Sequence, residues 1–151
     1  MGSLTLPSSG IVYVDTDCVI YSVEKIEPFS TLLDQVWRSA KAGAIQVVSS
    51  ELVVLETLVK PLKDGDTGLE ALFRELLLNS EEVRLIPIDL DIVERAASIR
   101  AGTGMKTPDA IHAATGLQIG CAGFVTNDPG FRRVANLPVI VLADQASLPR
   151  P

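Results

Sequence analysis

The chain has 151 residues, of which 47% are hydrophobic and 21% are charged, and its net charge is −6. This size allows one hydrophobic core, and the apolar content excludes a disordered chain. The acidic balance argues against nucleic-acid binding through basic side chains alone, unless bound divalent cations offset some of the acids.

Along the chain, residues 1–10 are small, polar and contain proline, which predicts a flexible leader. Residues 11–14 are short, β-branched and unalternating, as in a parallel strand that is buried on both faces. Residues 29–42 carry apolar side chains at helical spacing, and Gly43 then predicts the end of a helix.

The next segment predicts a second strand over residues 45–48. Ser49 and Ser50 can cap the helix that follows, which carries Glu56 and is expected to end before Pro61. The periodicity then predicts a helix over residues 69–78, a strand over 83–88 and a helix over 90–100.

The segment Thr107-Pro108-Asp109 predicts a helix start, with a capping hydroxyl, a proline at the first position and an acid in the first turn. Short buried strands are expected at residues 124–125 and 139–142, and a flexible tail over 146–151. Strands that alternate with helices predict one three-layer α/β/α domain over residues 11–145, with a mostly parallel central sheet. In such folds, ligands bind at the carboxyl ends of the strands.

Acidic side chains occur where that edge would bring them together. Asp15 and Asp128 follow predicted strands, Asp109 opens a helix, and Glu56 falls on the apolar face of its helix. A buried carboxylate is costly without a partner, and oxygen-only ligands suit Mg²⁺ or Mn²⁺ better than zinc. Such ions support phosphodiester hydrolysis. Taken singly, each acid also has an ordinary explanation as a strand end, a helix start or a turn.

Four segments carry motifs in a fixed order across residues 11–142. They are the apolar strand with Asp15-Thr16-Asp17, the serine-rich helix start that leads to Glu56, Thr107-Pro108-Asp109-Ala110, and Thr126-Asn127-Asp128 before Pro129-Gly130-Phe131. Together these segments resemble the PIN domain family, and within it the VapC-like toxins of prokaryotic toxin–antitoxin pairs.

The resemblance implies a PIN-like fold and a ribonuclease. It implies that four carboxylates hold the metal ion and act in catalysis: Asp15, Glu56, Asp109 and Asp128. It also implies that Thr126 or Asn127 orients the site through hydrogen bonds. Asp17 stands where the family more often has asparagine, so it is either an additional ligand or a supporting charge. A toxin of this kind implies a small antitoxin partner. The high hydrophobic content of the chain also favours a partner, because exposed apolar surface often marks a docking site, and we expect a homodimer as well.

Several other residues have two interpretations. Lys106, Arg132 and Arg133 flank the proposed site and are expected to contact RNA phosphates, although solvated surface charge is the alternative. His112 is the only histidine, and we favour a packed, hydrogen-bonded role for it over that of a general base.

Cys18 and Cys121 lie in apolar stretches outside metal-ligand spacing, which predicts reduced core thiols. The sequence has no apolar run long enough for a membrane span and no signal-like start. We therefore expect a cytoplasmic protein.

Two alternatives to the Mg²⁺- or Mn²⁺-dependent endoribonuclease stay open. The first is a haloacid-dehalogenase-like phosphatase, in which Asp15 attacks phosphorus and Asp17 protonates the leaving group. That interpretation leaves Glu56 and Asp109 unexplained. The second is a catalytically inert PIN-like module that serves as a docking surface.

Overall fold

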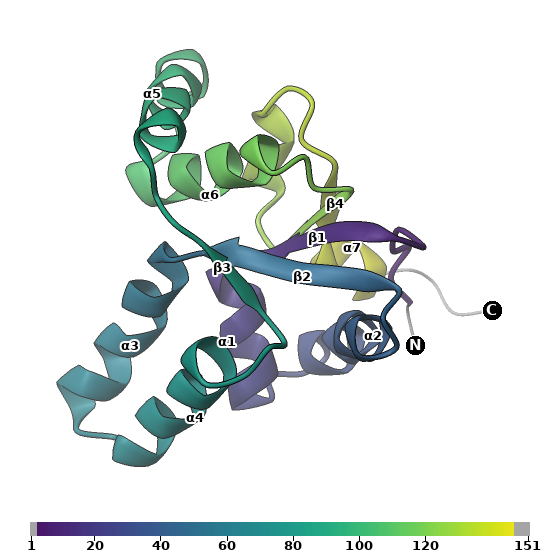
Figure 1. The fold of residues 1–151 in the computed structure, drawn as a ribbon, viewed down its shortest axis with the longest axis vertical. Helices are drawn as coiled ribbons and strands as arrows, with labels where there is room; N and C mark the ends of the chain where they lie inside the picture. The colour runs from purple at the N-terminus through teal and green to yellow at the C-terminus, as the bar shows by residue number, and fades with distance from the viewer. Residues whose placement is uncertain (1–2, 147–151) are drawn as a thin grey trace.

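The computed structural model describes residues 3–146 and centres on a five-stranded parallel sheet with the strand order β3-β2-β1-β4-β5 (Figure 1). The strands are β1 (Gly10–Val14), β2 (Ile45–Ser50), β3 (Arg84–Ile86), β4 (Gly123–Thr126) and β5 (Val139–Val141). Every strand pair is parallel, so the predicted α/β class and parallel sheet are confirmed.

Helices cover both faces of this sheet (Figure 1). One face carries α5 (Leu90–Thr103) and α6 (Thr107–Gln118). The opposite face carries α1 (Thr16–Glu24), α2 (Phe29–Lys41), α3 (Leu52–Asp64), α4 (Thr67–Leu78) and α7 (Leu142–Ala146). The resulting three layers are those that the sequence predicts.

Successive side chains of β1 point to opposite faces of the sheet, so β1 contributes to the core on both faces. Val12 and Val14 pack in the cluster under α1 to α4, whereas Tyr13 packs in the cluster under α5 and α6. The ring of Tyr13 stacks on that of Phe124, with 4.7 Å between the ring centroids. A Cβ atom at Gly116 of α6 would lie 2.8 Å from the Phe124 ring, so the glycine lets α6 approach β4 closely. Gly116 therefore allows the close packing of α6, the helix that carries Asp109 and His112, on β4.

Several local predictions differ from the structure, and one of them is Leu142, which was expected in the last strand and instead begins α7. The sequence did not predict α1, which begins directly after Asp15 because that side chain accepts the Cys18 N–H and caps the helix. Helix α3 continues past Pro61, where it was expected to end. The buried Pro61 lies in its last turns, and Gly65 closes the helix with a left-handed cap. Lys106, and not Thr107, occupies the N-cap of α6, without a side-chain capping bond.

The two predicted terminal segments lie only partly within the described residues. In the leader, Leu4 is buried and its N–H donates to Gln35 of α2 at 3.2 Å, so this part of the chain packs on the core. Residues 147–151 of the predicted tail lie outside the described residues. Within residues 3–146, no helix has the length and apolar character that crossing a membrane requires.

Candidate metal centre

A small acidic cavity lies at the carboxyl edge of the sheet. Asp15 directly follows β1, Glu56 comes from the second turn of α3, and Asp109 comes from the first turn of α6. The cavity measures about 170 Å³ and is lined by Asp15, Thr16, Asp17, Glu56, Asp109 and His112. The structure therefore brings three of the four predicted ligands, together with Asp17, around one space, which we call the acidic cavity.

Asp15 is the most enclosed of these acids, with an exposed fraction of 5%. Its Oδ1 accepts the Cys18 N–H at 3.3 Å, and its Oδ2 accepts the hydroxyl of Thr126 at 2.5 Å. Burial raises the pKa of Asp15 from 3.8 to about 6, although the hydrogen bond from Thr126 acts in the opposite direction. Two hydrogen bonds thus fix the orientation of a carboxyl group whose ionised form the fold disfavours.

The pKa values of Asp17 and Asp109 are also raised. Partial burial raises the pKa of Asp17, and the charges of Glu56 and Asp128 raise it further. Burial likewise raises the pKa of Asp109, followed by the charge of Asp128. The ionised form of each group is disfavoured partly by the charges of neighbouring acids. A cation bound among these acids would therefore reduce the repulsion between them.

Glu56 has a different environment. Its Oε1 accepts the Thr16 hydroxyl at 2.6 Å and lies 2.7 Å from Nε2 of His112. Burial acts to raise the pKa of Glu56, but the hydrogen bonds from His112 and Thr16 outweigh it and the pKa is lowered. Glu56 is therefore the acid of this cavity whose ionised form the neighbouring hydrogen bonds favour.

The three residues of the segment Thr126-Asn127-Asp128 have different contacts. Thr126 donates to Asp15 and also accepts the Asp128 N–H at 3.0 Å, so it links Asp15 to the loop that carries Asp128. Asp128 is exposed beside the acidic cavity, outside its lining, and accepts the Gly130 N–H at 2.8 Å. The amide of Asn127 bonds Tyr21 and the backbone of Ala143, which ties the loop after β4 to α1 and α7.

The donor atoms suit a hard divalent ion, because they are carboxylate oxygens with few basic neighbours. Among residues 3–146, however, no three His, Cys, Asp or Glu side chains already stand in a metal-binding arrangement. Both oxygens of Asp15 and one oxygen of Glu56 hold protein partners. The residues fit such an ion by their chemistry, and its coordination would require the carboxylates to shift.

The three predicted RNA-binding cations differ in their surroundings. Lys106 is exposed at the start of α6, and its charge lowers the pKa of Asp109. Arg132 pairs with Asp144, and Arg133 donates to the backbone oxygens of Thr103 and Gly130. Lys106 therefore adds positive charge at the cavity, whereas both arginines form contacts within the fold.

Sequence reasoning missed the roles of Thr16 and Tyr13, and it placed His112 only in the core. His112 is indeed buried, with an exposed fraction of 2%, but its ring also reaches Glu56 in the acidic cavity. The available signal was the spacing of His112, which lies three residues after Asp109 on α6, together with the position of Thr16 directly after Asp15.

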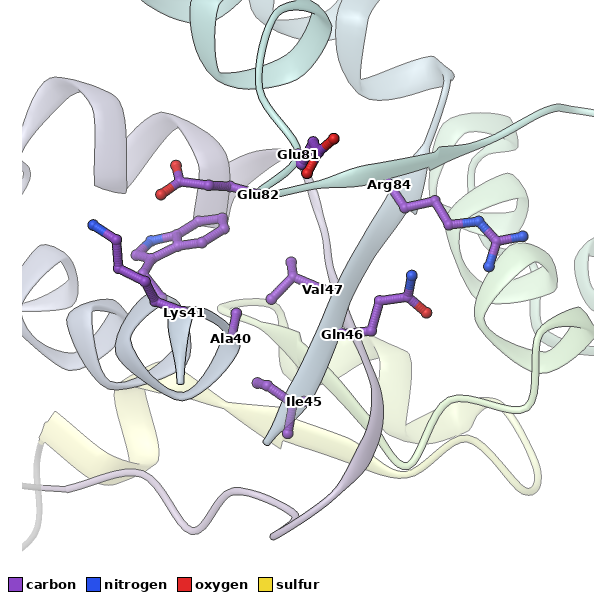
Figure 2. A pocket seen from close by; sticks show the side chains of 9 residues that line it. Ala40, Lys41, Ile45, Gln46, Val47, Glu81, Glu82 and Arg84 are labelled. Atoms are coloured by element: carbon purple, nitrogen blue, oxygen red, sulfur yellow. The ribbon is translucent and has the colours of Figure 1, made fainter. Parts of the chain in front are cut away.

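A second cavity of about 480 Å³ lies at the other end of the sheet, where β2 and β3 begin. Figure 2 shows Lys41 and Glu82 on one side of it and Arg84 on the other. It is lined by Trp37, Ala40, Lys41, Ile45, Gln46, Val47, Glu81, Glu82 and Arg84. We call this space the Trp37 cavity, and none of the predicted site residues lies in it.

Comparison with known proteins gives one family and a set of similar folds. The family model described as the PIN domain matches residues 12–137. A comparison with curated protein sequences gives no match. Several solved structures match over most of their length, and their TM-scores indicate a shared fold.

One is Mycobacterium tuberculosis VapC20, described as a sarcin-ricin loop cleaving toxin, with a TM-score of 0.69, 17% identity and coverage of 85% of this chain and 98% of that chain. Another is a toxin–antitoxin complex from Klebsiella pneumoniae, with a TM-score of 0.62, 22% identity and coverage of 87% and 97%. A third is VapBC2 from Rickettsia felis bound to promoter DNA, with a TM-score of 0.64, 14% identity and coverage of 85% and 96%.

Proposed function

The chain belongs to the PIN domain family, and from this premise we propose that it is an endoribonuclease that hydrolyses RNA phosphodiester bonds with Mg²⁺ or Mn²⁺. The observation that carries the proposal is the acidic cavity. Three of its carboxyl groups, those of Asp15, Asp17 and Asp109, have raised pKa values that burial and neighbouring acids cause. A site that holds acids in this state is suited to a cation.

The contacts of these residues support the following roles. Asp15 and Asp109 are the principal ligands, Glu56 and Asp128 complete the set, and Asp17 adds negative charge beside them. A divalent ion bound there supplies the positive charge that favours attack of water on a phosphodiester at neutral pH. Thr126 keeps Asp15 in position through its hydroxyl, and Lys106 is placed to attract a phosphate.

The direct test compares RNA cleavage by the native chain with that by Asp15→Asn and Asp109→Asn, in Mg²⁺ or Mn²⁺ and in a chelator. We expect each variant to lose at least about a hundredfold in rate, because altering even the residues that support metal ligands costs 10–100-fold. Glu82→Gln in the Trp37 cavity is the matched control and should retain the native rate. Equal cleavage by all four proteins would indicate a contaminant. No cleavage by the native chain would favour the inert module or the phosphatase.

We further propose that the chain is the toxin of a VapBC-type pair and binds a small antitoxin. Exposed apolar side chains support a partner. Leu55, Val59 and Leu62 follow one side of α3 with exposed fractions of 55–61%, and Leu72 of the adjacent α4 is 56% exposed. Single exposed apolar side chains are common, but four on two adjacent helices form a surface that another chain can cover. We call these four residues the α3–α4 patch.

Native co-purification with the tagged chain tests the antitoxin, with Leu55→Glu and Leu62→Glu as variants of the α3–α4 patch. We expect a small protein to accompany the native chain and to be lost from both variants, while Glu75→Gln, an exposed change on α4, retains it. Recovery of no small partner would count against the toxin proposal. Light scattering on the purified chain tests the expected homodimer separately, because a dimer has twice the mass without any second protein.

A further inference from the structure

A chain of hydrogen bonds runs from the core to the acidic cavity through His112. On one side of the ring, Nδ1 lies 2.5 Å from the hydroxyl of Tyr13. On the other side, Nε2 lies 2.7 Å from Oε1 of Glu56 and 3.1 Å from the hydroxyl of Thr16. Both ring nitrogens are therefore engaged, and His112 and Tyr13 are buried with exposed fractions of 2% and 0%.

The surrounding donors determine the direction of these bonds. The hydroxyl oxygen of Tyr13 accepts the Ser50 N–H at 3.2 Å, which leaves its proton for Nδ1 of His112. An Nδ1 that accepts leaves the proton of a neutral imidazole on Nε2, and Nε2 faces a carboxylate that can only accept. Every bond in the chain then has one donor and one acceptor.

At the cavity end of this hydrogen-bond chain, one oxygen of Glu56 is fixed. The hydroxyl of Thr16 and Nε2 of His112 both bond Oε1, whereas no described residue donates to Oε2. Tyr13 cannot drift, because its ring stacks on Phe124 and its hydroxyl is anchored by the backbone of β2. The carboxylate is thus held through Oε1, and Oε2 is left without a donor among the described residues.

From this arrangement we propose that His112, oriented by Tyr13, is a positioning residue that holds the Glu56 carboxylate through Oε1 and leaves Oε2 available to a divalent ion that would bind in the acidic cavity. This role rests on the proposed ribonuclease function for its effect on rate, but the hydrogen-bond chain itself does not. A histidine that served packing alone would need no partner among the acids of the cavity, and its replacement by a residue of similar shape would leave Glu56 unaffected.

The first measurement detects the hydrogen-bond chain directly and does not depend on RNA cleavage. Because His112 is the only histidine, ¹⁵N-histidine labelling gives a single imidazole whose two nitrogens are resolved by NMR at one fixed pH. We expect a proton on Nε2 and a hydrogen-bonded acceptor at Nδ1. Tyr13→Phe should shift the Nδ1 resonance towards that of a free acceptor, and Glu56→Gln should shift the Nε2 proton. A proton on Nδ1 instead, or resonances that neither variant moves, would overturn the proposal.

The second measurement uses a graded series at position 112. The amide nitrogen of His112→Gln can stand near the position of Nε2 and still donate to Glu56, whereas His112→Asn is too short and His112→Leu has no donor. We expect kcat to fall about 10–100-fold in the Asn and Leu variants and to recover partly in the Gln variant, with KM nearly unchanged. Equal kcat in all three would overturn the positioning role.

The two measurements separate this inference from the proposed function. If the native chain cuts no RNA, the ribonuclease proposal fails, and the NMR result still decides whether His112 holds Glu56. If the native chain cuts RNA and His112→Leu has the native kcat, the function stands and the positioning role fails. Should the position 112 variants not fold, Tyr13→Phe provides the kinetic test, because it removes the donor that orients His112 and leaves Glu56 intact.

Discussion

The acidic cavity and the Trp37 cavity lie at opposite ends of the same parallel sheet, and they differ in what their polar groups do. The Trp37 cavity is the larger, at about 480 Å³ against 170 Å³, but its charged side chains are exposed. The acidic cavity holds the buried Asp15 and a contact of 2.7 Å between Nε2 of His112 and Oε1 of Glu56. Buried and bonded polar groups, and not volume, distinguish the candidate site from an open depression.

The two cavities also have different structural origins. Parallel strands direct the loops after β1 and β4 to one edge, and that edge collects Asp15 and Asp128. The Trp37 cavity forms because β3 is short. Its first residue, Arg84, pairs with Val48, so residues 45–47 at the start of β2 have no strand beside them on that side. The acidic cavity therefore follows from the parallel topology of the sheet, and the Trp37 cavity from the shortness of β3.

The largest expected difference between the cavities is in the pH dependence of stability. Burial raises the pKa of Asp15 in the folded chain from 3.8 to about 6. Between these values the folded protein keeps a proton that the unfolded chain has released, so the unfolding free energy falls as pH rises from about 4 through 6. For this group the loss is roughly 3 kcal/mol.

Urea unfolding in a chelator, from pH 4 to 7, checks this prediction. Asp15→Asn should remove most of this decrease, while Glu82→Gln in the Trp37 cavity should keep it. Glu56 acts in the opposite direction, because its lowered pKa contributes stability that is lost as pH falls. The comparison of variants therefore isolates Asp15 better than the native profile does. An identical pH profile in Asp15→Asn would contradict the assigned burial cost.

A metal ion should stabilise the protein through the acidic cavity alone. At a Mn²⁺ concentration of about 100 times Kd, the unfolding free energy rises by about 2.7 kcal/mol if the ion binds only the folded chain. Asp109→Asn should lose this gain, and Glu82→Gln should retain it. Thermal unfolding with and without the ion measures both. A gain that survives in Asp109→Asn would place the ion elsewhere.

A smaller effect is expected from Trp37, whose Nε1 donates to the hydroxyl of Ser22 at 2.9 Å and so joins α2 to α1. Trp37→Phe removes this bond and leaves the Ser22 hydroxyl unpaired, which should lower the unfolding free energy by about 1 kcal/mol. The rate of RNA cleavage should not change. Circular dichroism during urea unfolding and a cleavage assay measure the two quantities, and a lower cleavage rate would link the two cavities.

The smallest effects are expected from the charges of the Trp37 cavity. Glu82 and Arg84 are exposed, so Glu82→Gln and Arg84→Gln should each change the unfolding free energy by less than about 0.5 kcal/mol. Urea unfolding at a single pH measures this. A larger loss in either variant would mean that the Trp37 cavity has a polar network of its own, and the contrast between the cavities would weaken.

The sequence alone predicts the layer architecture and most of the elements, because each depends on a local pattern. The β-branched run before Asp15 is a buried strand, and the Thr107-Pro108-Asp109 segment starts a helix. The acids were also identified from position, as residues that follow strands or open helices. Helix α1 was missed because its capping group, Asp15, had been interpreted as a ligand or as the end of a strand, and not as a helix cap.

Tertiary structure decided which polar groups meet. Tyr13 and His112 are 99 residues apart in the chain, and His112 and Glu56 are 56 apart, so no local pattern connects them. The same holds for Asn127, which bonds Tyr21 and is not part of the cavity lining. Local sequence determines the backbone through propensity and periodicity, whereas side-chain partners depend on how β1, α3 and α6 pack around one edge of the sheet.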